Sequence, residues 1–153
     1  MNLDLELQDI FHDPELPADE KFREWVRTTL EAAGRKEDTQ LAIRIVDEEE
    51  SAMLNERWRH RKGATNVMSF AMSGLDLIAP EVIGDIVICA PVVTKEADEQ
   101  NKQLYAHWAH MVVHGVLHLL GYDHKEEADA EKMESLEKEI LKKLGYPDPY
   151  ESE

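Results

Sequence analysis

The sequence predicts an α+β fold, with a small mixed sheet of about four strands packed with about five helices. Short segments with strand periodicity lie before residue 90, and most of the long segments with helical periodicity come later. Strands that come mostly early and helices that come mostly late indicate α+β architecture. The chain has 153 residues, 42% of them apolar, which is enough for one hydrophobic core. We therefore expect residues 1–153 to form a single domain.

Four strands are expected from short apolar segments, most of which alternate with polar residues. They cover residues 3–7, 41–45, 66–70 and 83–88. Residues 72–81, between the last two strands, follow neither periodicity and are expected to form a loop.

Five helices are expected from apolar residues at helical spacing. They cover residues 17–33, 47–60, 92–102, 104–120 and 126–144. Pro17 and Pro91 suit helix starts, and Asp47, with a glutamate three residues later, has the spacing of a helix cap. Gly34 and Gly63 are expected to end the first two helices.

The predicted helix over residues 104–120 is apolar nearly all round. A helix without a broad polar face is buried on all sides in a globular protein. We therefore expect this helix at the centre of the fold.

Composition argues against several protein classes. No apolar run approaches the roughly 18 residues of a membrane span. The first residues are acidic and lack the basic segment of a signal peptide. The single cysteine, Cys89, cannot form an internal disulfide and is expected to be a small core residue. We therefore expect a cytoplasmic protein.

The net charge of −16 argues against nucleic acid as a partner, but one window is positive. Residues 51–70 contain four basic residues and one acidic residue. The cations Arg57, Arg59, Arg61 and Lys62 surround an aromatic residue. They could hold a phosphate chain while the aromatic ring stacks a base. From composition alone, a solvated helix end is the more common explanation, because cations favour the C-terminal end of the helix dipole.

Three histidines form the strongest pattern in the sequence. His114 and His118 are four residues apart, so on a helix they lie on one face and can reach one metal ion. Gly121 can adopt the left-handed conformation that ends a helix and turns the chain back, which would bring His124 to the same ion. Three nitrogen ligands leave a tetrahedral ion one open position, as in catalytic sites. Zinc is the first choice, and imidazole also suits nickel, copper and iron. The alternative is a set of ordinary core histidines.

The histidine spacing is that of the metzincin peptidases, with one departure. The position of the catalytic glutamate is Gly115, which has no carboxylate. The standard metalloprotease mechanism is therefore not available from this motif.

Three further residues are weaker candidates for the site. His107 and His110 precede the ligands on the same helix and could line a substrate groove or support the ligands, and the alternative is packing with a hydrogen bond. We favour packing for His107 and leave both readings open for His110. Asp85 stands on a strand with Ile83 and Val87 as expected same-face neighbours, so it needs a partner such as a ligand histidine or Arg59. Alternatively, it lies at a sheet edge beside a bulge.

Four sequence blocks resemble the YbeY family of bacterial metal-dependent endoribonucleases, also called ribosomal RNA maturation factors. The blocks are residues 55–59 (NERWR), 65–70 (TNVMSF), 84–86 (GDI) and 114–124 (HGVLHLLGYDH). Their order and spacing match the family over most of residues 40–150, whereas residues 1–35 carry little motif information. Ala64 replaces the proline that usually precedes the second block.

The resemblance implies an α+β fold related to zincin catalytic domains, with His114, His118 and His124 as metal ligands. It implies that Arg59 is functionally important, and we assign catalytic roles to Arg59 and His114. It further implies cleavage of single-stranded RNA, in 3′-end maturation of the small-subunit (16S) ribosomal RNA and in ribosome quality control. The expected partners are this RNA and the ribosome or a ribosomal protein, with neither membrane nor DNA.

With this resemblance, the basic window becomes a candidate RNA contact. Arg59 would hold a phosphate or the transition state, and Arg57, Arg61 and Lys62 would bind RNA around it. Two nucleophiles remain open: a metal-bound hydroxide and the 2′-hydroxyl of the RNA. A 2′,3′-cyclic phosphate product would favour the second. Two other function classes also remain: a metallo-hydrolase of another substrate, and a ribosome-assembly factor whose metal is mainly structural.

Overall fold

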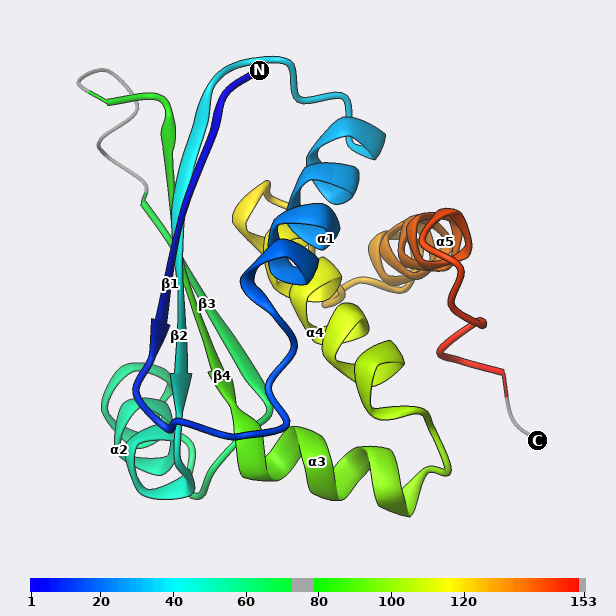
Figure 1. Ribbon diagram of the computed structural model, residues 1–153. Coiled ribbons are helices and arrows are strands. Elements are labelled where there is room, and N and C mark those ends of the chain that lie inside the picture. The colour runs from blue at the N-terminus through cyan, green and yellow to red at the C-terminus, as the bar shows by residue number, and fades with distance from the viewer. Residues whose placement is uncertain (73–78, 152–153) are drawn as a thin grey trace.

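A mixed four-stranded sheet forms one layer of the molecule in the computed structural model, which describes residues 1–72 and 79–151 (Figure 1). The strand order is β1-β2-β4-β3. The strands are β1 (Leu3–Asp9), β2 (Thr39–Val46), β3 (Val67–Ala71) and β4 (Val82–Cys89). The first three strands in this order run parallel, whereas β3 pairs antiparallel with β4 and forms an edge of the sheet.

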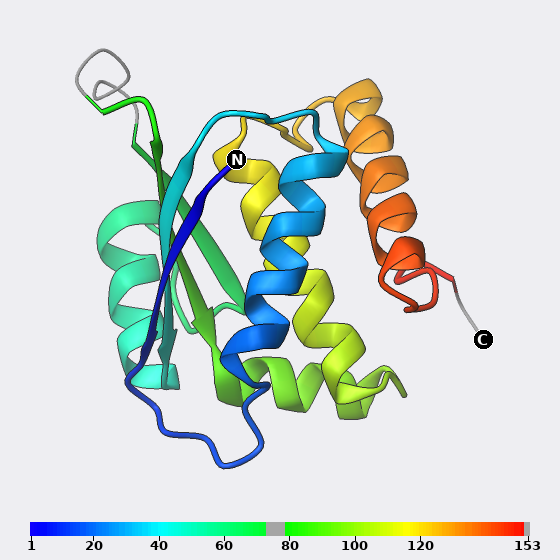
Figure 2. The ribbon, with the colours of Figure 1, turned by 45° about the horizontal axis from the view of Figure 1, so that its top comes forward.

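Helices cover the two faces of the sheet unequally (Figures 1 and 2). The helices are α1 (Asp19–Ala32), α2 (Glu48–Arg59), α3 (Ala90–Glu99), α4 (Leu104–Leu119) and α5 (Glu127–Lys143). One face of the sheet carries α4, which also contacts α1, α3 and α5, and the opposite face carries α2. No helix in the described part of the chain is long and apolar enough to cross a membrane.

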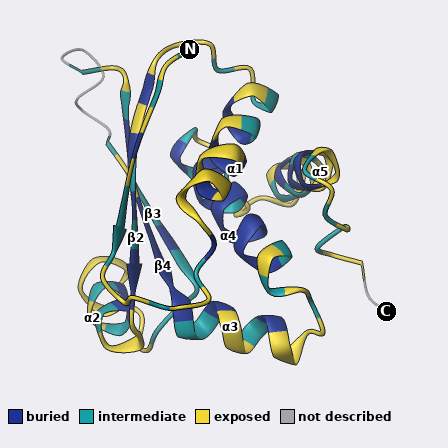
Figure 3. Cartoon of the chain, viewed as in Figure 1, coloured by how far each residue is buried: buried dark blue, intermediate teal, exposed yellow. Residues whose placement is uncertain are grey.

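The helix α4 is the centre of the fold, as its composition predicts. Most of its side chains are buried (Figure 3). The largest core cluster joins α4 to buried residues of α1, α5 and the facing side of the sheet. The predicted α+β architecture, with about four strands and five helices, is therefore confirmed.

The element boundaries differ from expectation where local capping decides them. The first helix begins at Asp19, because Ala18 is its N-cap and Pro17 lies outside it. The second ends at Arg59, and the prediction that Gly63 ends it was wrong. His60 itself adopts the left-handed conformation, with φ of 56°, and the N–H of the next residue, Arg61, donates to the Asn55 carbonyl. Of the predicted 72–81 loop, residues 73–78 lie outside the described residues.

A bulge in β4 changes which side chains share a face. Leu41 pairs with Gly84, whereas the preceding residue of β2 pairs with Val82, so Ile83 is the extra residue. Ile83 consequently joins the core cluster on the α4 side, while Val87 packs in a smaller cluster on the α2 side. The predicted common face of Ile83 and Val87 was therefore wrong. The predicted bulge at Gly84 is present, but β4 is an interior strand.

Gly84 is a position where the bulge tolerates only glycine. Its φ is +141°, and a Cβ there would lie 2.3 Å from the Phe70 carbonyl oxygen and 2.8 Å from Leu119 Cδ2. Gly34 also has a positive φ, of +82°, but a Cβ there would meet nothing within 4 Å.

We expect Gly34→Ala to lower the free energy of unfolding by about 1 kcal/mol, from backbone strain alone. Gly84→Ala should lower the free energy of unfolding by about 3 kcal/mol or more, because the backbone of the neighbouring strand must move. Urea unfolding measures both, and equal losses would contradict the steric argument.

Candidate functional site

The end of α4 brings three histidines together. His114 and His118 lie on consecutive turns, and their Nε2 atoms are 3.1 Å apart. Gly121, with φ of +99°, ends the helix, and the next N–H donates back to the Leu117 carbonyl in a tight reversal. The reversal places His124 so that one nitrogen of each histidine lies within 4.8 Å of the other two. The predicted three-histidine cluster therefore exists as a spatial group.

Asp123 shapes the turn that presents His124. Its Oδ1 accepts hydrogen bonds from the N–H groups of His124, at 2.6 Å, and Lys125, at 3.2 Å. These backbone donors, His124 first, lower the pKa of the Asp123 carboxyl. Asp123 therefore orders the backbone around the third histidine.

The donor set of this cluster fits a transition metal ion. Zinc–imidazole bonds are about 2.0–2.1 Å long, so nitrogen atoms this close can share one ion after small side-chain rotations. Burial, followed by the neighbouring His114 and His124, lowers the pKa of His118 to about 4. His118 is therefore neutral near pH 7, as a metal ligand must be.

A buried carboxylate on α5 holds the first histidine from behind. Glu137 is fully buried, and its Oε1 lies 2.7 Å from His114 Nδ1. Its Oε2 accepts from the Tyr150 hydroxyl and lies 3.0 Å from His110 Nε2. Burial raises the pKa of Glu137, but the hydrogen bonds and charges of His110 and His114 outweigh it and lower the pKa to about 2. His110, His114 and Glu137 are also close enough to hold a metal ion, but their 2.7 and 3.0 Å separations are hydrogen-bond lengths.

The other candidate histidine, His107, belongs to a separate network. Its Nε2 lies 2.9 Å from Glu96 Oε1, and the same carboxylate accepts from the Asn66 amide. Burial lowers the pKa of His107, while its contact with Glu96 opposes that shift. The favoured reading of His107 as a packed, hydrogen-bonded residue agrees with this geometry. His110, by contrast, contacts the carboxylate that supports His114.

One cleft joins the three histidines to the basic window. The cavity has a volume of about 590 Å³. It is lined by Arg59, Arg61, Thr65, Asn66, Val67, Met68, Ser69, His114, His118, Gly121, Tyr122, Asp123, His124 and Lys125. Two parts of the chain about sixty residues apart therefore share one open space.

Buried polar residues of α2 hold the arginine side of the cleft in place. The Asn55 side-chain amide donates to the Gly63 carbonyl at 2.9 Å, and the Asn55 backbone carbonyl accepts from the Arg61 N–H at 3.2 Å. Ser51 bonds through its hydroxyl to both the carbonyl and the N–H of Thr65, each at 3.0 Å. These bonds tie the end of α2, with Arg59, to the segment that leads into β3.

Not every predicted site residue reaches this cleft. Among the described residues that line it are neither Arg57 nor Lys62. The Arg57 guanidinium instead lies 5.2 Å from the centre of the Trp58 ring, which is 59% exposed.

Asp85 lines a different cavity, of about 390 Å³, beside Trp58 on the α2 side of the sheet. Burial, and then Glu6, raises the pKa of Asp85. Since the three histidines stand on the α4 side, this placement does not support Asp85 as a partner of a ligand histidine.

Gly115 explains why this site carries no helical glutamate. Its Cβ position faces the sheet, 3.0 Å from Ile86 Cγ2. The Ser69 hydroxyl also donates to the Gly115 carbonyl at 3.0 Å, joining β3 to α4. Glycine here allows close approach of helix and sheet, and a longer side chain would enter the core.

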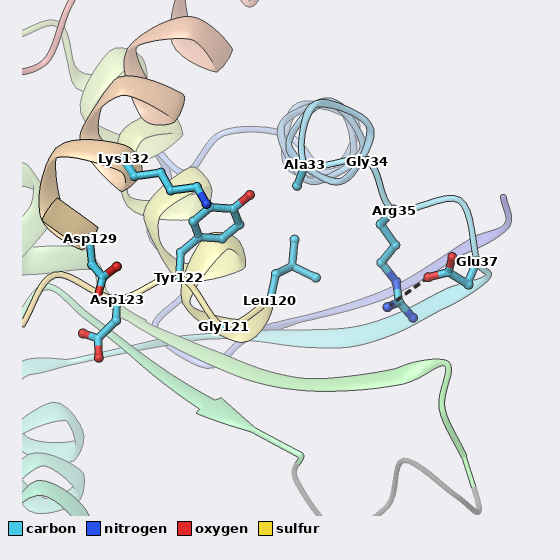
Figure 4. A pocket seen from close by; sticks show the side chains of 10 residues that line it. All are labelled: Ala33, Gly34, Arg35, Glu37, Leu120, Gly121, Tyr122, Asp123, Asp129 and Lys132. Atoms are coloured by element: carbon cyan, nitrogen blue, oxygen red, sulfur yellow. Dashed lines mark ion pairs between the residues drawn. The ribbon is translucent and has the colours of Figure 1, made fainter.

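A further cavity of about 530 Å³ lies beside the same turn (Figure 4). It is lined by Ala33, Gly34, Arg35, Glu37, Leu120, Gly121, Tyr122, Asp123, Asp129 and Lys132. Arg35 forms an ion pair with Glu37 at 3.5 Å (Figure 4). This cavity shares Gly121, Tyr122 and Asp123 with the histidine cleft but none of the three histidines.

Sequence reasoning missed several residues of the site, namely Glu137, Tyr150, Ser69 and Lys125. The sequence contains an indication of one of them, Glu137. Glu137 follows Met133 by four residues and precedes Ile140 by three, so a carboxylate interrupts the apolar face of α5. Tyr150 follows the last helix, and no periodicity indicates its partner.

Comparisons with known proteins agree with this arrangement of blocks. A family model described as endoribonuclease YbeY matches residues 8–145. The endoribonuclease YbeY of Pseudomonas fluorescens is 51% identical over 149 residues, 97% of this chain and 96% of that protein. The chain belongs to the YbeY family. The endoribonuclease YbeY of Nitrosococcus oceani is 47% identical over 154 residues, 99% of each protein.

The family match extends the resemblance toward the N-terminus, beyond the blocks that lie between residues 40 and 150. It includes α1, which carries none of those blocks. The solution structure of TM1509 from Thermotoga maritima superposes with a TM-score of 0.58 at 24% identity, over 97% of this chain and 99% of that one. This structural likeness shows that the α+β fold is shared.

Loss of one histidine should remove the metal and spare the fold. We expect the wild-type protein to retain about one zinc ion per chain after dialysis. His118→Ala should retain far less, with a nearly unchanged circular dichroism spectrum, because its imidazole is only half-buried. Elemental analysis measures the metal. The exposed His12 is the control, replaced by asparagine, which tolerates its positive φ. Full zinc retention in His118→Ala would contradict the site, and unfolding would make the ion structural.

Proposed function

We propose that this chain is a single-strand-specific, metal-dependent endoribonuclease. Its proposed role is 3′-end maturation of the small-subunit (16S) ribosomal RNA and ribosome quality control in the cytoplasm. The observation that carries the proposal is the cleft in which Arg59 faces the same space as His114, His118 and His124. The relatives named endoribonuclease YbeY support the reaction class. The cofactor would be one divalent ion, zinc or another transition metal such as nickel.

The charge of the cleft suits RNA although the whole chain is acidic. Arg59, Arg61 and Lys125 line the cleft, whereas the chain carries a net charge of −16. Acidic surfaces repel a phosphate chain, and a local group of cations attracts it. This distribution supports RNA binding at the cleft rather than along the whole surface.

The three histidines and Arg59 have distinct roles in the proposed reaction. The three histidines would hold the ion, which as a Lewis acid polarises a phosphate oxygen or a water molecule. The Arg59 guanidinium offers paired donors to the phosphate oxygens and stabilises charge that grows on them in the transition state. Because Gly115 provides no carboxylate, the general base must come from outside the position that serves peptidases.

Reversal of the Arg59 charge should slow RNA cleavage strongly without loss of metal. We expect Arg59→Glu to cleave single-stranded RNA about 10²-fold more slowly or worse, because a transition-state contact is replaced by a repulsive charge. Gel analysis of a labelled RNA measures the rate with metal-loaded and chelator-treated protein, and metal content is measured on each sample. A cleavage rate that neither the chelator nor the substitution changes would indicate a contaminating nuclease. One bound ion per chain without any cleavage would favour an assembly factor or an enzyme that requires the ribosome.

The salt dependence of RNA binding should separate two arginines of the basic window. Arg61 lines the cleft and Arg57 does not, so the two form a matched pair. We expect Arg61→Gln to lower the slope of log Kd against log salt by about 0.7, the value for one contact to a single strand. Arg57→Gln should change the slope less. Fluorescence anisotropy with a labelled single-stranded RNA measures both, and identical slopes for wild type and Arg61→Gln would contradict the proposed RNA contact.

A further inference from the structure

We infer that Glu137 is a positioning residue for the metal ligand His114, and that Tyr150 of the C-terminal segment holds Glu137. This inference rests on the metal centre of the proposed function and adds two residues to it. Neither residue lines the histidine cleft. Both act from the far side of α4.

The geometry places the carboxylate directly behind one ligand. Glu137 Oε1 is 2.7 Å from His114 Nδ1, and His114 Nε2 faces His118 Nε2 at 3.1 Å. The two ring nitrogens of His114 therefore point in different directions, one to the carboxylate and one to the histidine cluster. The fully buried position of Glu137 removes competing water from this contact.

The chemistry of a carboxylate then selects one form of the imidazole. An ionised carboxylate only accepts hydrogen bonds, so the nitrogen that contacts it carries the proton. In neutral His114 this puts the proton on Nδ1 and leaves the lone pair on Nε2, toward the cluster. Carboxylate support of this kind also fixes the ring and raises the basicity of a ligand.

The C-terminal segment completes the support. The Tyr150 hydroxyl donates to Glu137 Oε2, and its ring centre lies 5.4 Å from that of His110. The segment is anchored in turn, because Lys102 donates to the Pro149 carbonyl at 2.9 Å and the Tyr150 N–H donates to Asp148 at 2.8 Å. The side chain of Tyr150 therefore stands at a defined place over Oε2 and restricts rotation of the carboxylate.

Zinc affinity tests the inference without reference to RNA cleavage. We expect Glu137→Gln to bind zinc 10- to 100-fold more weakly than wild type, the usual effect of losing such a partner. Tyr150→Phe should weaken binding in the same direction but less. Glu131→Gln, an exposed position on the same helix, is the matched control and should bind as wild type does. Competition with a chromogenic chelator measures the affinities of the full-length chains.

The site of protonation on the His114 ring distinguishes a positioning role of Glu137 from a merely structural one. A merely structural role would leave the proton distribution between Nδ1 and Nε2 unchanged. Nitrogen-15 NMR of the metal-free wild-type protein should show His114 protonated on Nδ1. In Glu137→Gln it should show a mixture of the two neutral forms, because an amide can either accept or donate. If Glu137→Gln fails to fold, the wild-type spectrum and Tyr150→Phe still decide the question.

Three outcomes would overturn the inference. They are a wild-type His114 protonated mainly on Nε2, unchanged zinc affinity in Glu137→Gln, and, where Glu137→Gln does not fold, unchanged zinc affinity in Tyr150→Phe. Each leaves the proposed endoribonuclease standing. A wild-type protein that binds no zinc or other divalent transition metal would overturn the metal centre of the proposed function, and this inference with it.

Discussion

The close packing of α4 against the sheet is the constraint on which the site depends. Gly115 brings the helix near Ile86, and the Ser69 hydroxyl joins β3 to the Gly115 carbonyl. This contact lies beside His114, so the histidine is placed relative to β3, which forms one wall of the cleft. Core packing tolerates little change of volume, so small shifts of α4 are resisted by the whole apolar cluster. Precision at the cleft is thus a consequence of burial in the core.

Two carboxylates, one half-buried and one fully buried, extend this rigidity along α4. Glu96 of α3 contacts His107 and Asn66, while Glu137 of α5 contacts His110 and His114. The buried charge of Glu137 is tolerated only because hydrogen bonds satisfy it, and both carboxylates contact histidine nitrogens. The helix therefore presents an apolar side to the sheet and a histidine-bearing side to neighbouring acids. Only its end opens to the cleft.

The proposed contact with RNA depends on how charge is distributed around the cleft. The described cations of the cleft come from the end of α2, the segment after it, and the residue that follows His124. Asn55 and Ser51 hold the α2 end against the segment that leads into β3, which keeps Arg59 and Arg61 at the cleft. An acidic chain can in this way bind RNA at one place while repelling it elsewhere.

The sequence alone determined the α+β class, the buried central helix and the three-histidine cluster, because helix spacing and a glycine reversal are local properties. It also indicated Arg59, through a block shared with a family. Tertiary structure decided the rest. The bulge placed Ile83 on the opposite face of β4 from Val87, and Asp85 lies in a cavity away from the histidines. Glu137 reaches His114, and Tyr150 reaches Glu137, across distances in sequence that no periodicity encodes. Contacts of this kind depend on how separate elements pack, so they appear only once the chain is folded.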